Sequence, residues 1–497
     1  MTAVTADRSD PVLEPAERRA ILLGTIFRVV GTPLVALVGL LNTAMIVRQT
    51  GEAVFGLVSL VTTLTLLMPF ADLGIGAVVI SACSQRGHMV DDPVAVATVQ
   101  RGMRRLNLVA VVLIAISLLI MATDSWGFLL GSTAGPSDRV AITIAACLIA
   151  LGVPAGIGIR ILIGLDKNPL AVLLTMSNAI FTLLITLGLK ASGVDGIWYA
   201  VSGAGGALIG NCIATVLALK LSGLGRLAFA RPGAEHAGSK LLQGSLWMFV
   251  VSIGLPMGLQ SQRLILSHVS TSAELSRYAL IAQVYGVTWM VFSTAGVALW
   301  PVFVKRRSDM GTSTRLWLRS AGAFGVLSAL AGVGLVILGP WATSVLSGGQ
   351  LVATRALAIS VALLLVVQCV HLPGGVMLTM PREMRWQSQC LLAMGLTTVV
   401  LGVWWGGRWG GAGVVAAAVV ATVAAQIVPD FVWIPRLLRR RAQELAVADE
   451  FPETAIADSS SPAPETHYTR THTEPGPMER RCREKAASGG LAESGRR

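Results

Sequence analysis

The sequence predicts an all-α polytopic membrane protein, with about twelve transmembrane helices in two parallel six-helix lobes around a central cavity. Three observations predict this fold: long apolar stretches, basic residues gathered in alternate gaps, and residue patterns that recur between the two halves. The chain of 497 residues is 54% hydrophobic and only 13% charged. Such a composition is far from that of a soluble globular domain.

The apolar stretches give the number of crossings. A helix needs roughly 20 apolar residues to cross a hydrocarbon core about 30 Å thick. The first stretch contains Arg28 and lacks a small-residue cleavage site, so we expect it to remain as the first helix. The predicted crossings are 21–47, 54–80, 106–122, 140–163, 170–189, 198–219, 242–267, 278–303, 316–338, 354–379, 388–405 and 411–434.

Basic residues set the predicted orientation. Even-numbered gaps carry clusters such as Arg101, Arg104 and Arg105, whereas each odd-numbered gap holds one basic residue. The positive-inside rule therefore places the even gaps and both termini in the cytoplasm, with the chain in the plasma (inner) membrane. This arrangement also accounts for the net charge of +12. No basic helix or aromatic platform accompanies the charge, so we expect no nucleic-acid partner.

The gaps and tails divide the chain into five parts. Residues 1–20 form a polar cytoplasmic tail, residues 21–221 the N-lobe, and residues 222–241 a cytoplasmic linker. Residues 242–435 form the C-lobe. Residues 436–497 are rich in Glu, Ser, Thr and Pro and are expected to be a disordered cytoplasmic tail, because they bury too little apolar surface to fold.

The two halves share residue patterns at a nearly constant offset. Since both halves begin from the cytoplasm, such repeats are parallel and related by an axis along the membrane normal. They predict a cavity between the lobes that opens alternately to each side by rocking. The matched segments are Pro154-Ala155-Gly156 with Pro373-Gly374-Gly375, Gly196-Ile197-Trp198 with Gly407-Arg408-Trp409, and Phe55 with Tyr278.

Polar side chains at bilayer depth are site candidates, because an ionisable group there costs about 2.5–3.5 kcal/mol. Arg28 and Arg263 lie in the first helices of the two lobes. The planar guanidinium suits phosphate, which it binds with paired hydrogen bonds. The alternative is that each Arg extends to nearby headgroups. The predicted substrate-binding residues are Arg28, Arg263, Gln260, Gln262, Gln283 and Tyr285.

Prolines and one carboxylate form a second, structural set. Proline removes a helix hydrogen bond and can kink a crossing. Such a kink either gives the helix a fixed bent shape or forms part of a gate. Asp72 follows Pro69 and is expected to cap the helix that resumes there. His371 is expected to be a satisfied interhelical histidine rather than a proton relay. The predicted gating or structural residues are Pro69, Asp72, Pro154, Pro256 and Pro373.

Neither a metal nor another cofactor is predicted. The six cysteines form no metal or redox spacing. No catalytic residue is predicted either, since transport requires no covalent chemistry, and the protein is expected not to be an enzyme.

Two short motifs carry a family resemblance. Arg48, Gly51, Phe55 and Gly56 fit an Arg-x-x-Gly-x-x-x-(Phe/Tyr)-Gly turn after the first helix. A Pro-x-x-Asp-Leu-Gly-(Ile/Leu) run is matched by Pro69, Asp72, Leu73, Gly74 and Ile75. With these motifs the chain resembles Wzx-type polysaccharide or O-antigen flippases of the multidrug/oligosaccharidyl-lipid/polysaccharide (MOP) exporter superfamily over about residues 20–435. A family carboxylate often stands where this chain has Gln262.

The resemblance implies a substrate and partners. It implies movement of a polyprenyl-pyrophosphate-linked oligosaccharide, the repeat unit of a lipopolysaccharide or exopolysaccharide, while the lipid tail stays in the bilayer. Cationic Arg side chains would lower the barrier for the pyrophosphate. Membrane lipids, a polysaccharide polymerase and glycosyltransferases are the implied partners.

Several other functions compete with this one. A lipid II flippase or a multidrug exporter of the same superfamily remains open. A membrane-embedded polysaccharide polymerase or ligase would need a large outer loop, but the longest outer gap runs only from about Thr123 to Arg139. A sugar transporter of the major facilitator class fits poorly, because Gln85-Arg86-Gly87-His88 does not match its signature. An ATP-driven pump is disfavoured, since Gly233–Lys240 reverses the end of a phosphate loop.

Overall fold

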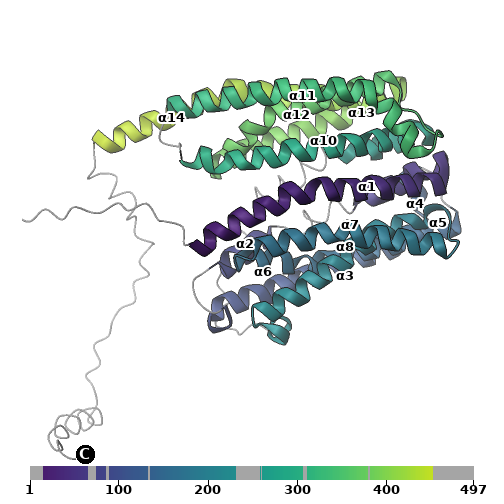
Figure 1. Cartoon of the computed structure of the whole chain (residues 1–497), viewed down its shortest axis with the longest axis horizontal. Coiled ribbons are helices and arrows are strands. Elements are labelled where there is room, and N and C mark those ends of the chain that lie inside the picture. The colour runs from purple at the N-terminus through teal and green to yellow at the C-terminus, as the bar shows by residue number, and fades with distance from the viewer. Residues whose placement is uncertain are drawn as a thin grey trace, which may run out of the picture. The chain divides into compact units, whose positions relative to one another are not determined.

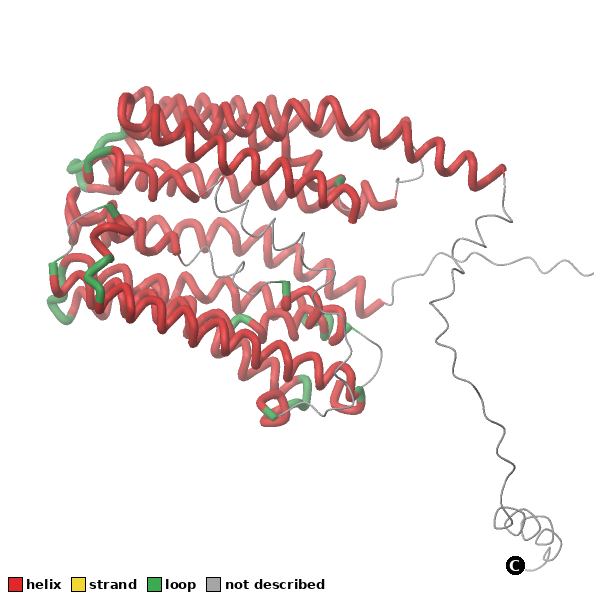
Figure 2. The backbone as a smooth tube through the Cα atoms, turned by 180° about the vertical axis from the view of Figure 1, so that it is seen from behind, coloured by secondary structure: helices red, strands yellow, loops and turns green. Residues whose placement is uncertain are grey.

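The computed structural model describes residues 15–64, 74–84, 89–131, 135–230, 258, 260–305, 310–378 and 381–450, with only the backbone course for 15–30 and 441–450. Throughout these residues the chain is helical and contains no strand, as Figure 2 shows. It divides into two units, Met1–Ala442 and Gln443–Arg497. The first unit holds the helix bundle.

The first half of the bundle begins with α1, which is long enough to cover parts of two predicted crossings. Short 3₁₀ turns, η2 (Met89–Asp91), η3 (Gly196–Tyr199) and η4 (Gly225–Phe229), join longer helices. The helices are α1 (Pro15–Thr63), α2 (Ile75–Cys83), α3 (Pro93–Ala122), α4 (Trp126–Leu130), α5 (Pro136–Ala155), α6 (Ile157–Gly164), α7 (Asn168–Ala191) and α8 (Ala200–Leu221).

The second half starts with a helical segment at 260–269. Its later helices are long, and a π-helical turn, η6 (Val423–Ile427), interrupts the last of them. The elements are α10 (Ser272–Lys305), α11 (Met310–Ser347), α12 (Arg355–Met377), α13 (Pro381–Thr422) and α14 (Val428–Glu450).

Nine helices within the described residues are long and apolar enough to cross a membrane. This number is smaller than the predicted twelve for two reasons: two pairs of predicted crossings each form one helix bent at a single glycine, and a third crossing is mostly not described. Gly51 (φ 72°) bends α1 between the first two predicted crossings, and Gly410 (φ 55°) bends α13 between the last two. Only glycine adopts such backbone angles readily, so one residue replaces a loop. Most of the predicted crossing 242–267 lies outside the described residues.

The predicted kink-forming residues have different outcomes. Pro154 stands one residue before the end of α5, and α6 begins after Gly156, so the crossing breaks there. Pro373 lies inside α12 without ending it. Pro69, Asp72 and Pro256 lie outside the described residues.

The helices pack in two groups that meet along α1. In the first group α7 and α5 pack against α8, and in the second α11, α10 and α13 pack against α12. Figure 1 shows α10–α13 on one side of α1 and α2–α8 on the other, and α1 contacts both α7 and α10. Small residues permit close approach within a group. A Cβ at Gly206 of α8, for example, would lie 2.7 Å from Thr182 Cα of α7.

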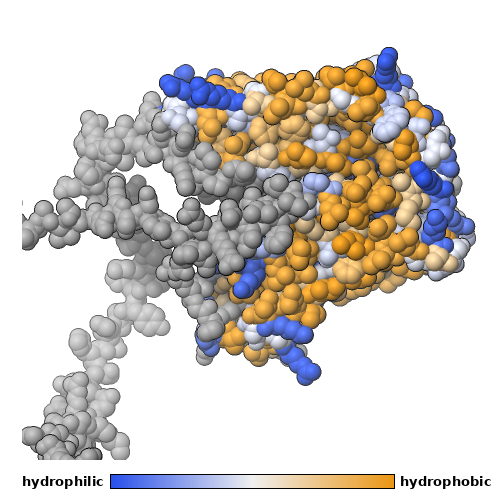
Figure 3. All heavy atoms as spheres, in the orientation of Figure 1, coloured by the Kyte–Doolittle hydropathy of each residue, from blue (hydrophilic) through white to orange (hydrophobic). Residues whose placement is uncertain are grey.

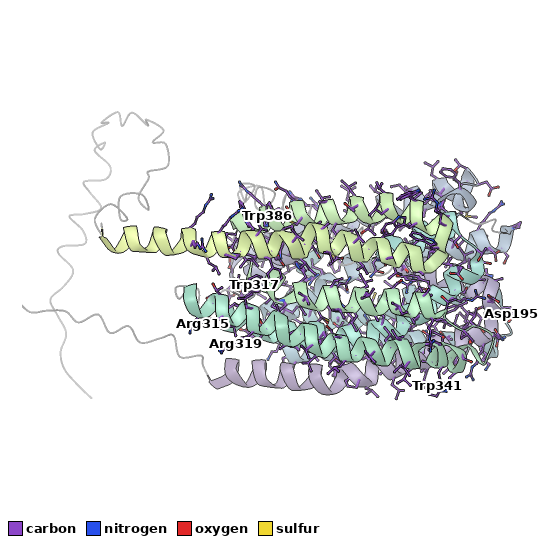
Figure 4. The ribbon with its side chains drawn as sticks, turned by 90° about the horizontal axis from the view of Figure 1, so that it is seen from above. Asp195, Arg315, Trp317, Arg319, Trp341 and Trp386 are labelled. Carbon is purple, nitrogen blue, oxygen red and sulfur yellow. The ribbon has the colours of Figure 1, made fainter. Side chains whose placement is uncertain are left out.

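The surface is that of a multi-pass membrane protein. Large apolar side chains such as Leu330, Ile337 and Val400 are about two-thirds exposed (66%, 68% and 67%). Figure 3 shows apolar atoms across the middle of the bundle and polar atoms towards its ends. Figure 4 places the exposed Arg315 and Arg319 at one end and Asp195 at the opposite end. The Arg315 end is the one predicted to be cytoplasmic, and we call the Asp195 end the outer end.

Candidate functional site

Arg263 lies where the two halves of the bundle meet. Its Nη1 donates a hydrogen bond of 2.5 Å to Thr63 Oγ1 at the end of α1. Its Nε is buried and has no hydrogen-bond partner among the described residues. A side chain extending to headgroups would point along the bundle towards its end. The guanidinium instead points across to the other half and keeps an unused donor.

Gln283 is a second polar residue at this junction. A Cβ added to Gly39 of α1 would lie 3.6 Å from Gln283 Nε2 on α10. The side chain therefore faces the first helix of the other half, on the same boundary as Arg263. Gln260 stands three residues before Arg263 and is half-buried.

Two other predicted site residues are bonded within the second half. Gln262 is almost fully buried (1% exposed), and its Oε1 accepts a hydrogen bond of 2.8 Å from the Tyr278 hydroxyl. The Tyr285 hydroxyl donates to Gln368 Oε1 on α12. These contacts direct both side chains into their own helix group rather than across the junction. Arg28 lies on α1, in the part for which only the backbone is described.

Arg48 joins the halves at the outer end. Its Nη2 donates to Val345 O at 2.7 Å, and its Nε donates to Leu346 O at 3.3 Å. Both carbonyls belong to the last turn of α11, where helix carbonyls lack intrahelical partners and carry partial negative charge. The sequence motif contained Arg48, but nothing in the sequence identified α11 as its partner.

The rest of the same motif packs against the start of α10. Ser276 Oγ donates a 2.5 Å hydrogen bond to Glu52 O, and Arg277 Nη2 lies 3.6 Å from Glu52 Oε1. Gly56 is required for this approach, because a Cβ there would lie 2.7 Å from Ser276 Oγ. We call the contacts of Arg48, Glu52 and Gly56 with the second half the outer clasp. A further bond, His268 Nε2 to Phe128 O at 3.0 Å, joins the halves nearby.

A largely buried hydrogen bond between a histidine and an aspartate lies elsewhere in the second half. His371 Nδ1 on α12 and Asp430 Oδ2 on α14 are 2.7 Å apart. The contact is interhelical, as predicted for His371. Among the described residues, no group of three or more His, Cys, Asp or Glu side chains is arranged to hold a metal ion.

Comparison with known proteins gives a family and a fold. The profile of the family described as "Polysaccharide biosynthesis protein" matches residues 21–307, which is more than half of the chain. A search of the curated proteins finds no match. Solved structures match along most of the chain, but with low sequence identity.

Three of these structures illustrate the fold. An inward-facing multidrug resistance MATE family transporter of the MOP superfamily aligns with a TM-score of 0.61 and 12% identity, covering 84% of this chain and 99% of that one. A MOP superfamily transporter from Pyrococcus furiosus gives 0.58 and 13%, covering 86% and 96%. The lipid II flippase MurJ in an inward closed conformation gives 0.57 and 13%, covering 85% and 93%. The protein has the fold of these transporters, and by its sequence it belongs to the polysaccharide biosynthesis protein family.

Proposed function

We propose that the protein is a flippase that moves a polyprenyl-pyrophosphate-linked oligosaccharide across the plasma membrane by alternating access. The observation that carries the proposal is the Arg263 guanidinium, which stands between the two halves with an Nε donor that no described residue uses. A buried cation is costly in a membrane, and such residues mark substrate pathways. A pyrophosphate crossing the bilayer needs a cation of this kind.

The geometry suggests how the substrate parts are separated. The pyrophosphate is held by Arg263, whose fork accommodates two phosphate oxygens once Thr63 gives way. Gln283 is placed on the same boundary to bond sugar hydroxyls, with Gln260 nearby and Arg28 on the first helix. Gln262 and Tyr285 orient the helices that carry these groups. The polyprenyl tail stays in the lipid.

The outer clasp supports a conformational assignment. Its contacts join the halves at the end that carries Asp195, so in this state the outer end is closed. With the Arg315 end and both termini in the cytoplasm, the substrate enters from the inner leaflet. Opening of the outer clasp then releases it to the outer leaflet, where a polymerase takes it up.

A lipid II flippase and a multidrug exporter share this fold. The charge at the junction between the halves distinguishes the proposed function from that of a multidrug exporter. Exporters of cationic drugs use buried carboxylates, whereas the junction between the halves presents a guanidinium. A lipid II flippase shares the pyrophosphate chemistry with the proposed function and differs from it in the glycan.

Reconstitution tests the proposal. Liposomes containing the full chain receive a fluorescent polyprenyl-pyrophosphate oligosaccharide in one leaflet, and a membrane-impermeant quencher reports its arrival in the other. We expect Arg263→Ala to slow translocation at least roughly tenfold, equivalent to about 1.4 kcal/mol, and Arg263→Lys to slow it less. Arg139→Ala is the matched control, because Arg139 forms a partly exposed salt bridge with Asp124.

Two results would overturn the proposal. One is no translocation by the wild-type protein of any pyrophosphate-linked glycan, accompanied by export of cationic dyes. The other is an Arg263→Ala variant that reconstitutes normally and translocates at the wild-type rate.

A further inference from the structure

The His371–Asp430 pair is not among the residues that the proposed function places at the pyrophosphate. The Nδ1 and Oδ2 atoms are 2.7 Å apart, and the two side chains are 17% and 8% exposed. The pair joins α12 to α14, in the half of each predicted crossing that approaches the cytoplasm. Isolated ionisable groups at this depth are costly, and chains of Asp, Glu and His there mark proton pathways.

The backbone around the pair is shaped to fit it. A Cβ at Gly374 would lie 2.6 Å from Asp430 Oδ2, and one at Gly375 would lie 3.3 Å from His371 Nε2. Glycine at both positions therefore leaves room for the carboxylate and for the second imidazole nitrogen. The π-helical turn η6 ends directly before α14, three residues before Asp430. Such turns inside helices are frequent at functional sites.

Besides Asp430, one buried carboxylate lies on the helices packed around the pair within the described part of the chain: Glu383 of α13, one turn before Gln387. On α13, the Cys390 thiol is near enough to Asp430 to interact electrostatically, and Gln387 Nε2 donates to Gly375 O at 3.0 Å. On α11, the Trp317 ring packs against Phe431 at a centroid distance of 5.0 Å. The cations of α11, Arg315 and Arg319, lie two residues to either side of Trp317 and are exposed. His371 Nδ1 is the imidazole nitrogen hydrogen-bonded to Asp430 Oδ2.

Several polar side chains lie in the second half between the pair and Arg263. Gln368 lies three residues before His371 on α12, hence on the same helix face, and accepts a hydrogen bond from Tyr285. Tyr278 stands two turns before Tyr285 on α10. The Tyr278 hydroxyl donates to Gln262 Oε1 at 2.8 Å, and Gln262 precedes Arg263 in the sequence. The second half therefore carries polar groups from the junction to the His371–Asp430 pair.

We propose that the His371–Asp430 pair is a proton-binding site through which a proton gradient drives substrate movement. The inference rests on the proposed flippase function and adds the coupling ion. It departs from the sequence-based expectation that His371 is not a proton relay, because the structure gives His371 a carboxylate partner. In the loaded form both imidazole nitrogens carry hydrogen, Nδ1 donates to Asp430, and the pair is net neutral. In the unloaded form Nε2 has lost its proton and the pair carries one negative charge.

The charge difference gives the coupling its direction. A net neutral pair is far cheaper to enclose in a low-dielectric bundle than a pair with an uncompensated carboxylate. The loaded form therefore favours an enclosed pair, and the unloaded form favours a pair open to water. Nε2 takes a proton from the outer aqueous phase and releases it to the cytoplasm while the substrate moves outward.

The test uses the full-length protein in liposomes and the labelled lipid-linked oligosaccharide. The membrane potential is held at zero, and a pH difference of one unit is imposed, acidic on the side of the outer end. With one proton exchanged per substrate, the steady distribution between leaflets shifts roughly tenfold per pH unit. Without the pH difference, the wild-type protein only equilibrates the lipid.

Variants locate the site. His371→Gln and Asp430→Asn keep hydrogen-bonding groups but cannot bind the proton, so we expect equilibration without the tenfold shift. The control is Asp166→Asn, an exposed carboxylate at positive φ (58°), where asparagine is well tolerated. If either variant no longer equilibrates lipid, proton release on substrate binding is measured in weakly buffered detergent. We expect about one proton per bound substrate from wild type and none from the variants.

The outcomes separate the two proposals. Wild-type protein that equilibrates the lipid but shows no shift under the pH difference overturns the proton site and leaves the flippase intact. A shift driven by a sodium gradient instead, or a full shift in His371→Gln, overturns it as well. Failure of the wild type to equilibrate the lipid at all is a failure of the flippase proposal.

Discussion

At the scale of single residues, the contacts of Arg263 indicate whether this cation has a structural or a functional role. Its bond to Thr63 crosses between the halves, while its Nε has no partner among the described residues. A purely structural cation would use all of its donors, because each buried donor left without a partner costs about 1–3 kcal/mol. The unused donor is therefore where we place the phosphate.

Thr63 tests this arrangement directly. We expect Thr63→Val to remove the hydroxyl that the guanidinium bonds and to lower stability by about 1–3 kcal/mol, seen as a lower melting temperature in detergent. Addition of the lipid-linked substrate should recover most of the loss, since its phosphate replaces the hydroxyl. Thr50→Val is the control, because its hydroxyl bonds Ile46 O within α1. Equal effects in both variants would contradict the prediction.

Residue orientation marks the limit of the sequence prediction. Gln262 and Gln283 share with Arg263 a place at bilayer depth in the second lobe, and the sequence therefore predicts one site for all three. Hydropathy predicts how deep in the bilayer a residue lies, but not which face of its helix it occupies. The packing of α10 against α12 and α1 decides it, placing Gln283 at the junction and Gln262 inside its own group.

At the scale of elements, single glycines decide how helices continue. Gly51 (φ 72°, ψ −178°) and Gly410 (φ 55°, ψ −139°) occupy backbone regions that are open essentially to glycine alone. The hydropathy pattern located the crossings but gave no sign that their connections would be single residues. The pairing of His371 with Asp430, 59 positions apart, likewise depends on helix contacts that spacing does not encode.

Replacing Gly51 measures the cost of this backbone conformation. Nothing lies within 4 Å of a Cβ there, so Gly51→Ala changes only the conformational energy. We expect a loss of about 1–3 kcal/mol in the free energy of unfolding. Gly188→Ala is matched to it, since the site is equally open but lies inside α7, where alanine is favourable. A Gly51→Ala variant as stable as the wild type would contradict this reading.

At the scale of the whole molecule, the outer clasp holds the halves together at one end. Arg48 bonds α11, Glu52 O accepts from Ser276, and Gly56 leaves room for the Ser276 side chain. Arg48 and Gly56 belong to one sequence motif, whose other positions turn the chain at Gly51 and bury Phe55. The motif was recognisable in the sequence, whereas its partners on α10 and α11 were not. Alternating access requires this clasp to open and close.

Thiol labelling reports on the clasp. Ser276 is fully buried (0% exposed), so a Ser276→Cys reporter in a background without other cysteines should label slowly with a membrane-impermeant reagent. Adding Arg48→Ala removes the bonds to Val345 and Leu346, and we expect labelling to rise several-fold. A Ser272→Cys reporter, at an exposed position of the same helix, should label equally in both backgrounds. Unchanged labelling at position 276 would show that Arg48 does not hold the outer end closed.

The central claim is that this protein moves a lipid-linked glycan from the inner to the outer leaflet. The most direct measurement follows lipid-linked glycan intermediates in cells that lack the gene. We expect these intermediates to accumulate on the cytoplasmic leaflet, and the intact gene, but not Arg263→Ala, to restore the normal pool. Normal lipid-linked pools in those cells, together with altered sensitivity to cationic dyes, would contradict the claim.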